Sequence, residues 1–344
     1  MKILVRATNW LGDAVMGIPA LREIRRAFTG DEIVVLARPW VAELYAREDF
    51  CDRILSYESR GRHQGWRGKR LLAGELRAER FDQAILFQNA FDAALLAFAA
   101  RIPRRIGYAR DARSLLLTDA IRVPRAGDIP AHQRFYYLEL LRRAGLIKEL
   151  PECADIRLGG VAQAAEAGRR GWSKRGLPEG PWIGVSPGAA YGSAKRWIPE
   201  HFAQAARLTA NELGARVALF GDSSEAELGR RIASQIGDGA HVLAGDTTLG
   251  EFIELASTCS VYLTNDSGPM HVASALGIPT AAVFGATDHV ATGPSASWAR
   301  VIREPVDCAP CLLRECPIDH RCMTRVTPER VAREALELVA AAKP

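Results

Sequence analysis

The stretch from residue 259 to 285 constrains the fold more than any other part of the sequence. Residues 259–263 are small, β-branched or apolar, as expected of a short buried strand. A polar turn containing glycine follows, then a helical run over 272–277 that stops at a glycine, and then a second apolar stretch over 280–285. Strand, tight turn, helix and strand in this order predict a unit of a parallel α/β sheet.

The turn inside this unit has the properties of a phosphate-binding site. Asp266 or Ser267 can cap the helix, and Pro269 occupies its first turn, where a missing N–H has no consequence. The free N–H groups around Gly268 and the positive end of the helix dipole then face the C-terminal edge of the sheet. An ordinary capped turn is the alternative, but His271, one turn into the helix and beside Asp266, favours a site.

A second loop at the same sheet edge supplies positive charge. The expected strand 182–186 opens into residues 187–197, where Gly188 and Gly192 let the backbone approach a ligand and Lys195 adds a cation. The two loops together predict a pyrophosphate clamp, with a flexible surface loop as the alternative. The pattern G-x-x-x-x-G-K-[ST] is absent, which disfavours a Walker NTPase. A third strand end, 220–225, could hold ribose hydroxyls, although helix capping by Ser223 or Ser224 is the favoured interpretation.

The N-terminus repeats the arrangement of strand, glycine turn and helix. An apolar strand over residues 2–8 runs into Asn9, Trp10, Leu11, Gly12 and Asp13, which do not match the G-x-G-x-x-G fingerprint of dinucleotide-binding folds. Asp13 near a helix N-terminus is either a capping residue or a general base, because open α/β sheets place their chemistry at the C-terminal ends of strands.

The rest of the chain continues this alternation and predicts two doubly wound domains. We expect further strands over 32–37, 53–56, 83–87, 104–108, 216–220 and 241–243. Between residues 150 and 160 the periodicity breaks. We therefore place an N-terminal domain at 1–158, a C-terminal domain at 159–327, and a final helix at 328–344 that packs back on the first domain.

Composition and charge narrow the class of protein. A chain of 344 residues, 48% hydrophobic and 25% charged, is globular and long enough for two cores. Its start lacks the apolar length of a signal peptide, and its longest helical apolar run is far short of the roughly 20 residues that span a bilayer, so we expect a cytoplasmic protein with at most peripheral membrane contact. Residues 1–150 hold 26 Lys and Arg against 18 Asp and Glu, whereas residues 151–344 hold 19 against 22. The basic first half suggests an anionic partner, unless it is merely a solvated arginine-rich surface.

Three motifs in series carry a resemblance to a known family. They are residues 9–13, the segment from Ser186-Pro187-Gly188 to Lys195-Arg196-Trp197, and residues 265–271. Together they resemble the lipopolysaccharide heptosyltransferases of glycosyltransferase family 9. The form P-G-x-x-x-G-x-A-K-R-W is most similar to the heptosyltransferase II branch.

The resemblance implies a GT-B fold of two Rossmann-like domains that face each other across a cleft. It implies an inverting transfer of heptose from ADP-heptose to the inner core of lipopolysaccharide, a heptose-Kdo2-lipid A acceptor, without a metal or other cofactor, at the cytoplasmic face of the inner membrane. Asp13 would be the general base. The donor would be held by Gly188, Lys195, Asp266, Ser267, Gly268 and His271, and the acceptor by Asn9, Trp10, Gly12, Arg60 and Arg62.

Four cysteines near the end of the chain admit two interpretations. Cys308, Cys311, Cys316 and Cys322, with His320 among them, have the density of a structural zinc site. Free packed thiols, or a disulfide formed after isolation, are the alternative, and the resemblance does not decide between them.

Other functions remain open on the sequence alone. Within the family, heptosyltransferase I or III activity is the alternative, and a GT-B sugar-nucleotide epimerase is another enzyme of the same fold. Outside enzymes, the arginines and clustered cysteines could belong to a nucleic-acid-binding module, although no recognition helix or aromatic RNA-binding motif is present and we expect no nucleic-acid partner.

Overall fold

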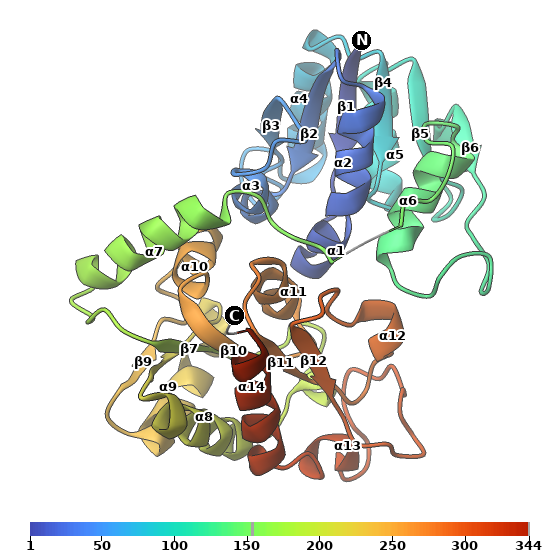
Figure 1. Ribbon diagram of the computed structural model, residues 1–344. Helices are drawn as coiled ribbons and strands as arrows, with labels where there is room; N and C mark the ends of the chain where they lie inside the picture. Colours follow the sequence, from blue (N-terminus) through green and yellow to red (C-terminus); the bar gives the residue numbers. More distant parts are fainter. Residues whose placement is uncertain (153–154, 343–344) are drawn as a thin grey trace. The chain divides into compact units, whose positions relative to one another are not determined.

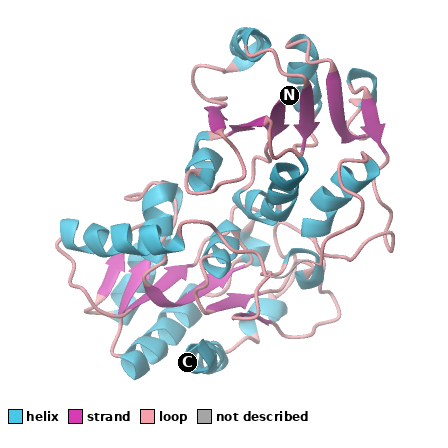
Figure 2. Cartoon of the chain, turned by 45° about the horizontal axis from the view of Figure 1, so that its top comes forward, coloured by secondary structure: helices cyan, strands magenta, loops and turns pink. Residues whose placement is uncertain are grey.

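The computed structural model describes residues 1–152 and 155–342. The chain divides into two compact units, unit 1 over Met1–Cys153 and unit 2 over Ala154–Pro344. Each unit contains one sheet of six parallel strands with helices packed against it (Figures 1 and 2). The predicted α/β class with two Rossmann-like doubly wound domains is confirmed.

The sheet of unit 1 has the strand order β3-β2-β1-β4-β5-β6. Its central strands β1, β2 and β4 are almost wholly buried because apolar residues fill their middles, as is typical of a parallel sheet covered on both faces. The strands are β1 (Lys2–Arg6), β2 (Glu32–Ala37), β3 (Arg53–Ser56), β4 (Gln83–Leu86), β5 (Arg104–Tyr108) and β6 (Asp119–Ile121).

The helices of unit 1 form two packed pairs, α2 with α6 and α4 with α5. Leu72, Leu76 and Leu96 come from the second pair and join the strands in one hydrophobic core. The helices are α1 (Leu11–Met16), α2 (Ile18–Ala27), α3 (Pro39–Tyr45), α4 (Gly65–Ala78), α5 (Phe91–Ala99), the 3-10 turn η1 (Ser114–Leu116) and α6 (Arg134–Arg143).

The sheet of unit 2 has the order β12-β11-β10-β7-β8-β9, which is the same topology as in unit 1. All its neighbouring strands pair in parallel, and the longest, β10, is buried along nearly its whole length. The strands are β7 (Trp182–Ser186), β8 (Arg216–Leu219), β9 (Ala240–Val242), β10 (Cys259–Asn265), β11 (Thr280–Val283) and β12 (Ala299–Ile302).

The helices of unit 2 also form two sets, α8 with α9 and α14, and α7 with α10. The first set shares a core with the strands, to which Phe202, Ile232 and Val331 contribute. The helical elements are α7 (Val161–Lys174), η2 (Ser193–Lys195), α8 (Pro199–Leu213), η3 (Ser223–Glu225), α9 (Ala226–Ile236), α10 (Leu249–Ala256), α11 (Gly268–Ala275), α12 (His289–Thr292), α13 (Arg321–Thr324) and α14 (Pro328–Ala342).

This topology decides where a ligand can bind in each unit. In both sheets the chain reverses its direction of winding next to the first strand, between β1 and β4 and between β7 and β10. The loops that leave neighbouring strands at such a point diverge to opposite faces of the sheet and leave a crevice at the carboxyl edge. Asp13 follows β1, Lys195 follows β7 and Asp266 follows β10, so each lies next to a switch point.

Two expectations from the sequence need correction. The edge strands β6 and β12 were not expected, because both are short and only partly buried. The last helix, α14, for which packing on the first domain was expected, buries its apolar side against α8 and strands β10 to β12 of its own unit. Residues 343–344 of that segment lie outside the described residues.

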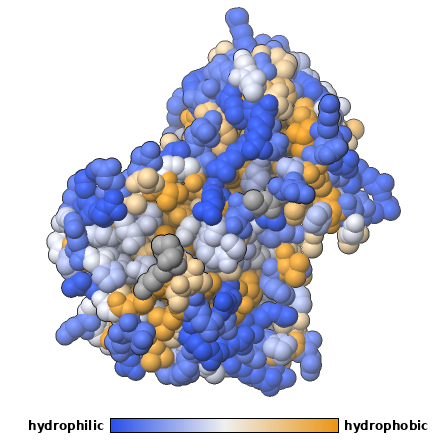
Figure 3. Space-filling view, in the orientation of Figure 1, coloured by the Kyte–Doolittle hydropathy of each residue, from blue (hydrophilic) through white to orange (hydrophobic). Residues whose placement is uncertain are grey.

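Hydrophilic side chains cover most of the visible surface of each unit (Figure 3). Within the described ranges, no helix combines the length and the apolar character that a membrane span requires.

Candidate functional site

Asp13 lies inside the first turn of α1, three residues after the N-cap position at Trp10. The N-cap residue Trp10 makes no side-chain capping hydrogen bond, and Asp13 is the acidic residue of the first turn. The buried hydroxyl of Tyr137, on α6, makes a hydrogen bond with the Asp13 carboxylate. Burial, and after it the charge of Asp13, raise the pKa of Tyr137 well above its ordinary value, so Tyr137 keeps its proton and donates to the carboxylate.

Lys195 and Asp266 bring the two predicted loops of unit 2 together. The Lys195 ammonium lies 2.6 Å from an Asp266 carboxylate oxygen, and both side chains are largely buried. The Thr287 hydroxyl, which follows β11, donates to the same Asp266 oxygen. Lys195 therefore sits at the β7–β10 switch point, as the sequence predicts for a cation of a pyrophosphate clamp.

Asn265, the last residue of β10, fixes the spacing between these loops. Its side-chain oxygen accepts from the Trp197 N–H at 2.9 Å, and its side-chain nitrogen donates to the Pro187 carbonyl at 2.7 Å. The Asn265 side chain is fully buried, so these bonds are shielded from water. The loop that carries Lys195 is thereby held to the strand that leads into Asp266.

The N-terminus of α11 is built as expected, with one difference. Gly268 begins the helix, Pro269 lies in its first turn and Ser267 occupies the N-cap position. The Ser267 side chain makes no capping hydrogen bond, and Asp266 is engaged by Lys195 instead of capping the helix. Ser267, one of the two residues that could cap the helix, is therefore the N-cap residue, but without a side-chain hydrogen bond. His271 is buried in the first turn and a half of the same helix.

Gly188 is required by a close approach to Glu225, a residue that the sequence argument did not single out. A Cβ atom at Gly188 would lie 1.6 Å from a Glu225 carboxylate oxygen. Burial raises the pKa of Glu225, against the opposing effect of the Asp222 N–H that its carboxylate accepts. The predicted capping at 220–225 does occur, but Asp222, and not Ser223 or Ser224, supplies the capping oxygen.

The cysteine-rich segment supports the Lys195 loop from outside. The Ala194 N–H donates to the Arg314 carbonyl at 3.0 Å, and the Tyr191 hydroxyl donates to the Leu312 carbonyl at 2.8 Å. The His320 ring nitrogen lies 3.0 Å from the Ala194 carbonyl. Residues 312–320 therefore help to fix the loop that presents Lys195.

The four cysteines of this segment are free thiols. Burial, and then the charges of Cys308, Cys316 and Cys311, raise the pKa of Cys322 to about 11. Within residues 1–152 and 155–342, no group of three or more His, Cys, Asp or Glu side chains is arranged to hold a metal ion. The zinc interpretation of Cys308, Cys311, Cys316 and Cys322 is therefore not supported by this arrangement.

The predicted acceptor residues differ in how they are held. Asn9 is fixed, because its side-chain oxygen accepts from Arg6 at 2.7 Å and from Arg38 at 3.2 Å. Trp10 is 65% exposed, and Gly12 lies partly buried in α1. Arg60 is exposed near Arg38, whereas Arg62 is exposed but engaged in an ion pair with Glu75.

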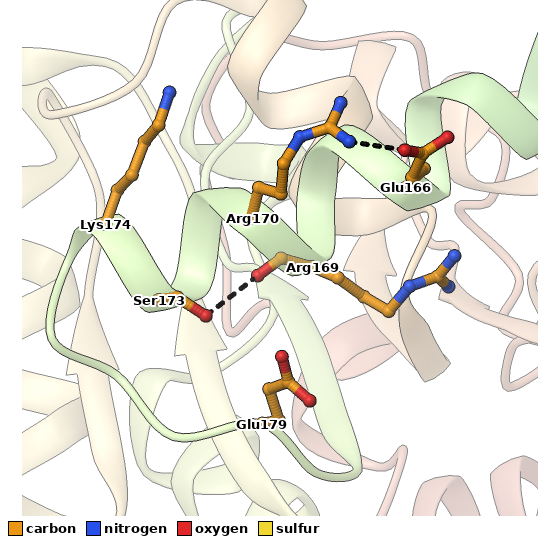
Figure 4. Close-up of a pocket in the computed structure, with 6 residues that line it drawn as sticks. All are labelled: Glu166, Arg169, Arg170, Ser173, Lys174 and Glu179. Carbon is orange, nitrogen blue, oxygen red and sulfur yellow. Dashed lines mark hydrogen bonds and ion pairs between the residues drawn. The ribbon is translucent and has the colours of Figure 1, made fainter.

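A hollow beside α7 does not qualify as a site (Figure 4). All six residues that line it are exposed, and two of them, Arg170 and Glu166, pair with each other at 2.5 Å on the helix surface. Ser173 donates to the Arg169 carbonyl of the same helix, as the dashed line in Figure 4 shows. The hollow flanks the segment that enters β7, so it lies away from the carboxyl edge where Lys195 and Asp266 meet.

Comparison with known proteins identifies the family to which this chain belongs. The sequence profile of glycosyltransferase family 9 (heptosyltransferase) matches residues 70–321, which is most of the chain. The chain belongs to glycosyltransferase family 9. This family 9 enzyme is 32% identical to lipopolysaccharide heptosyltransferase 2 of Salmonella typhimurium over 309 residues, which cover 88% of each chain.

Solved structures agree with the family assignment. The structure of ADP-heptose lipopolysaccharide heptosyltransferase II from E. coli superposes with a TM-score of 0.83 at 29% identity, over 100% of each chain. A family 9 glycosyltransferase from Veillonella parvula gives a TM-score of 0.85 at 23% identity over 99% of this chain and 98% of that one, which shows the shared fold.

Two residues that contact the predicted site residues were not singled out from the sequence. Tyr137 contacts Asp13, and Thr287 contacts Asp266, over long separations along the chain. Glu225 differs from them, because it belongs to the strand end 220–225 that was considered as a binding segment.

Proposed function

We propose that this chain is an inverting heptosyltransferase of the heptosyltransferase II type. It moves L-glycero-D-manno-heptose from ADP-heptose to a heptose-Kdo2-lipid A acceptor in the inner core of lipopolysaccharide. The observation that carries the proposal is the Lys195–Asp266 pair at the β7–β10 switch point, next to the N-terminus of α11. The similarity to lipopolysaccharide heptosyltransferases supplies the substrates. We propose that transfer takes place at the cytoplasmic face of the inner membrane.

Unit 2 binds the donor in this mechanism. Lys195 and the N–H groups at Gly268 hold the pyrophosphate, since a cation and a helix N-terminus both stabilise phosphate oxygens. Gly188 lets the loop backbone approach the nucleotide, and Glu225 accepts hydrogen bonds from ribose hydroxyls. His271 lies on the sugar side of the pyrophosphate.

Unit 1 binds the acceptor and supplies the base. Asp13 takes the proton from the acceptor hydroxyl as that oxygen forms a bond to C1 of the heptose. The bond between C1 and the phosphate oxygen breaks on the opposite side, and ADP leaves with the electron pair. Lys195 and the α11 N-terminus stabilise the charge that develops on ADP, which is the role of a divalent ion in other transferases. The transfer then requires no metal, and the configuration at C1 inverts.

A mass-spectrometric transfer assay tests this function. The purified chain is incubated with ADP-heptose and with Kdo2-lipid A acceptors that carry zero, one or two heptoses. Addition of 1 heptose to the acceptor that already carries one supports the proposal. Transfer to the heptose-free acceptor would indicate heptosyltransferase I activity, and transfer only to the acceptor with two heptoses would indicate heptosyltransferase III activity. No transfer to any acceptor, with donor converted alone, would favour an epimerase.

A further inference from the structure

A group of arginines in unit 1 gathers at the carboxyl edge of three neighbouring strands. Arg6 ends β1, and Arg38 follows β2 directly. Tyr57 follows β3, and Arg60 lies three residues further along the same loop. Because β1, β2 and β3 are parallel neighbours, these side chains belong to one edge of the sheet.

Arg6 is buried and Arg38 is half-buried, and neither forms an ion pair with a carboxylate of the described residues. Arg6 is 3% exposed, and its guanidinium donates to two backbone carbonyls and to the Asn9 side chain. Arg38 donates to the same Asn9 oxygen at 3.2 Å. The Arg6 Nε and Arg38 Nη1 atoms are buried and have no hydrogen-bond partner. The hydrogen-bond partners of these guanidinium groups are therefore neutral, and part of their donor capacity is unused.

Tyr57 and Asp92 lie close to the arginines, and the negative charge of Asp92 offsets only part of their positive charge, because Asp92 is itself paired with Lys69. Both guanidinium groups lie over the Tyr57 ring, Arg38 at 4.4 Å and Arg6 at 5.2 Å from its centre. Asp92 accepts from the Tyr57 hydroxyl at 2.9 Å and pairs with Lys69 at 2.6 Å. In the part of the chain that the structure describes, no carboxylate forms an ion pair with Arg6, Arg38 or Arg60.

Placing like charges together in a buried position is unfavourable unless something compensates. Burial, and then the charge of Arg38, lower the pKa of Arg6 to about 10. Burial also lowers the pKa of Arg38, and the charge of Arg60 adds to this effect. Unpaired buried charges and unmet donors both destabilise a folded protein, and a bound anion would relieve both.

A surface hollow of about 230 Å³ opens onto this group. Arg38, Tyr57 and Arg60 line it, and Trp40 forms one wall with its indole N–H held by the Asn9 carbonyl at 3.1 Å. The Glu58 side chain also lines the hollow but is exposed to solvent. A flat aromatic wall beside clustered guanidinium groups suits a sugar ring that carries an anionic group.

We infer that Arg6, Arg38 and Arg60 form a binding site for an oxyanion, a phosphate or a carboxylate, carried by a sugar that packs against Trp40. Arg38 and Arg60 contact the oxyanion, and Arg6 is a positioning residue that acts through the shared Asn9 oxygen. The assignment of this oxyanion to the glycosyl acceptor rests on the proposed function, whereas the anion site itself does not.

Inorganic phosphate tests the anion site without any acceptor. The Trp40 indole N–H signal, identified by its loss in Trp40→Phe, is followed by NMR while phosphate is added at constant ionic strength. We expect a saturable shift in the native chain that is lost in Arg38→Met. The shift should persist in Arg77→Met, which removes an exposed arginine of α4 outside the hollow. No shift in the native chain, or an equal loss in Arg77→Met, would overturn the inference.

The acceptor assay then identifies the source of the anion. With the native acceptor, Arg38→Met should raise the acceptor KM on the order of 10- to 100-fold, while kcat and the donor KM stay near normal. Arg38→Lys keeps the positive charge but loses the planar guanidinium group that can donate two parallel hydrogen bonds. Its acceptor KM should therefore lie between the values of the native chain and of Arg38→Met. Acceptors whose phosphates are removed, or whose carboxylates are esterified, show which group binds, because the effect of Arg38→Met disappears with that group.

The phosphate titration tests the anion site, and the acceptor assay tests the assignment of the anion to the acceptor. An equal effect of Arg38→Met on every acceptor would overturn the assignment of the anion to the acceptor, even if phosphate binds. If no acceptor is glycosylated but the phosphate shift depends on Arg38, the proposed function fails and the anion site stands. The NMR spectrum of each variant shows whether it is folded. If Arg38→Met does not fold, Arg38→Lys replaces it in both experiments.

Discussion

The two units differ in whether the positive side chains at the sheet edge are paired with a carboxylate. In unit 2, the Lys195 ammonium is paired with Asp266, and a threonine hydroxyl supports the carboxylate. In unit 1, Arg6 and Arg38 form no ion pair among the described residues, and their guanidinium groups share one neutral amide oxygen as a hydrogen-bond acceptor. Both groups lie at the carboxyl edge of a sheet of the same topology.

The difference suggests two kinds of anion binding. An anion that reaches Lys195 must compete with Asp266, so binding is moderated and the product can leave once its bond to the sugar has broken. An anion that reaches Arg38 meets donors without a competitor, and binding needs no ion pair to open. We interpret unit 2 as a reversible clamp for a leaving group and unit 1 as a fixed anchor that positions the acceptor beside Asp13.

The largest effect should come from Asp13→Asn, which tests whether unit 1 also supplies the chemistry. Loss of a general base lowers kcat on the order of 10²- to 10⁴-fold, and ADP binding should stay unchanged because the proposed donor residues belong to unit 2. Heptose transfer by mass spectrometry and ADP titration by calorimetry measure the two quantities. Tyr137→Phe, which removes the hydroxyl that contacts Asp13 and Gln133 but leaves the Asp13 carboxylate, should lower kcat less. A near-normal rate of Asp13→Asn would exclude Asp13 as the base.

A smaller effect is expected from Lys195→Met, which tests the clamp of unit 2. ADP affinity should fall on the order of 10- to 100-fold, because a charge-assisted hydrogen bond to phosphate is lost. The same change leaves Asp266 buried without its cation, which should lower the free energy of unfolding by about 3–5 kcal/mol. Calorimetric ADP titration and urea unfolding measure these two changes separately.

The double variant Lys195→Met with Asp266→Asn is the control for that experiment. It removes both charges, so much of the unfolding free energy should return while ADP affinity stays low. Recovery of ADP affinity together with stability would mean that Lys195 is only a structural partner of Asp266, and the contrast between the two units would then disappear.

The sequence predicted the interior of both sheets better than their edges. Strands β1, β2, β7 and β10 have apolar middles, and such segments indicate buried parallel strands whatever their surroundings. Of the edge strands, β3 and β9 were expected, whereas the short and partly buried β6 and β12 were not. These two strands pair with a neighbour on one side only, so burial leaves a weaker pattern in their sequence.

The candidate site shows the same limit. Glycine turns at strand ends predicted the loops of Asp13, Lys195 and Asp266, because these signals are local. The partner of each group is set by packing over long separations: Tyr137 lies 124 residues from Asp13, counted along the sequence. Asp266 illustrates the consequence, since its neighbours in sequence indicate a helix cap whereas its neighbours in space make it the partner of Lys195.

The smallest expected effect concerns Glu225, a half-buried carboxylate in unit 2. Glu225→Gln keeps an oxygen to accept the Asp222 N–H but replaces the carboxylate, so ADP affinity should fall only about 3- to 10-fold. Burial raises the pKa of Glu225, so the native carboxyl stabilises the fold below its unfolded pKa, and this contribution is lost as the pH rises through the raised pKa. Glu225→Gln has no such loss. The free energy of unfolding of Glu225→Gln should therefore increase relative to that of the native chain as the pH rises from acid to neutral. Urea unfolding across this pH range measures the difference. A difference that is constant with pH would show that the pKa of the native carboxyl is not raised.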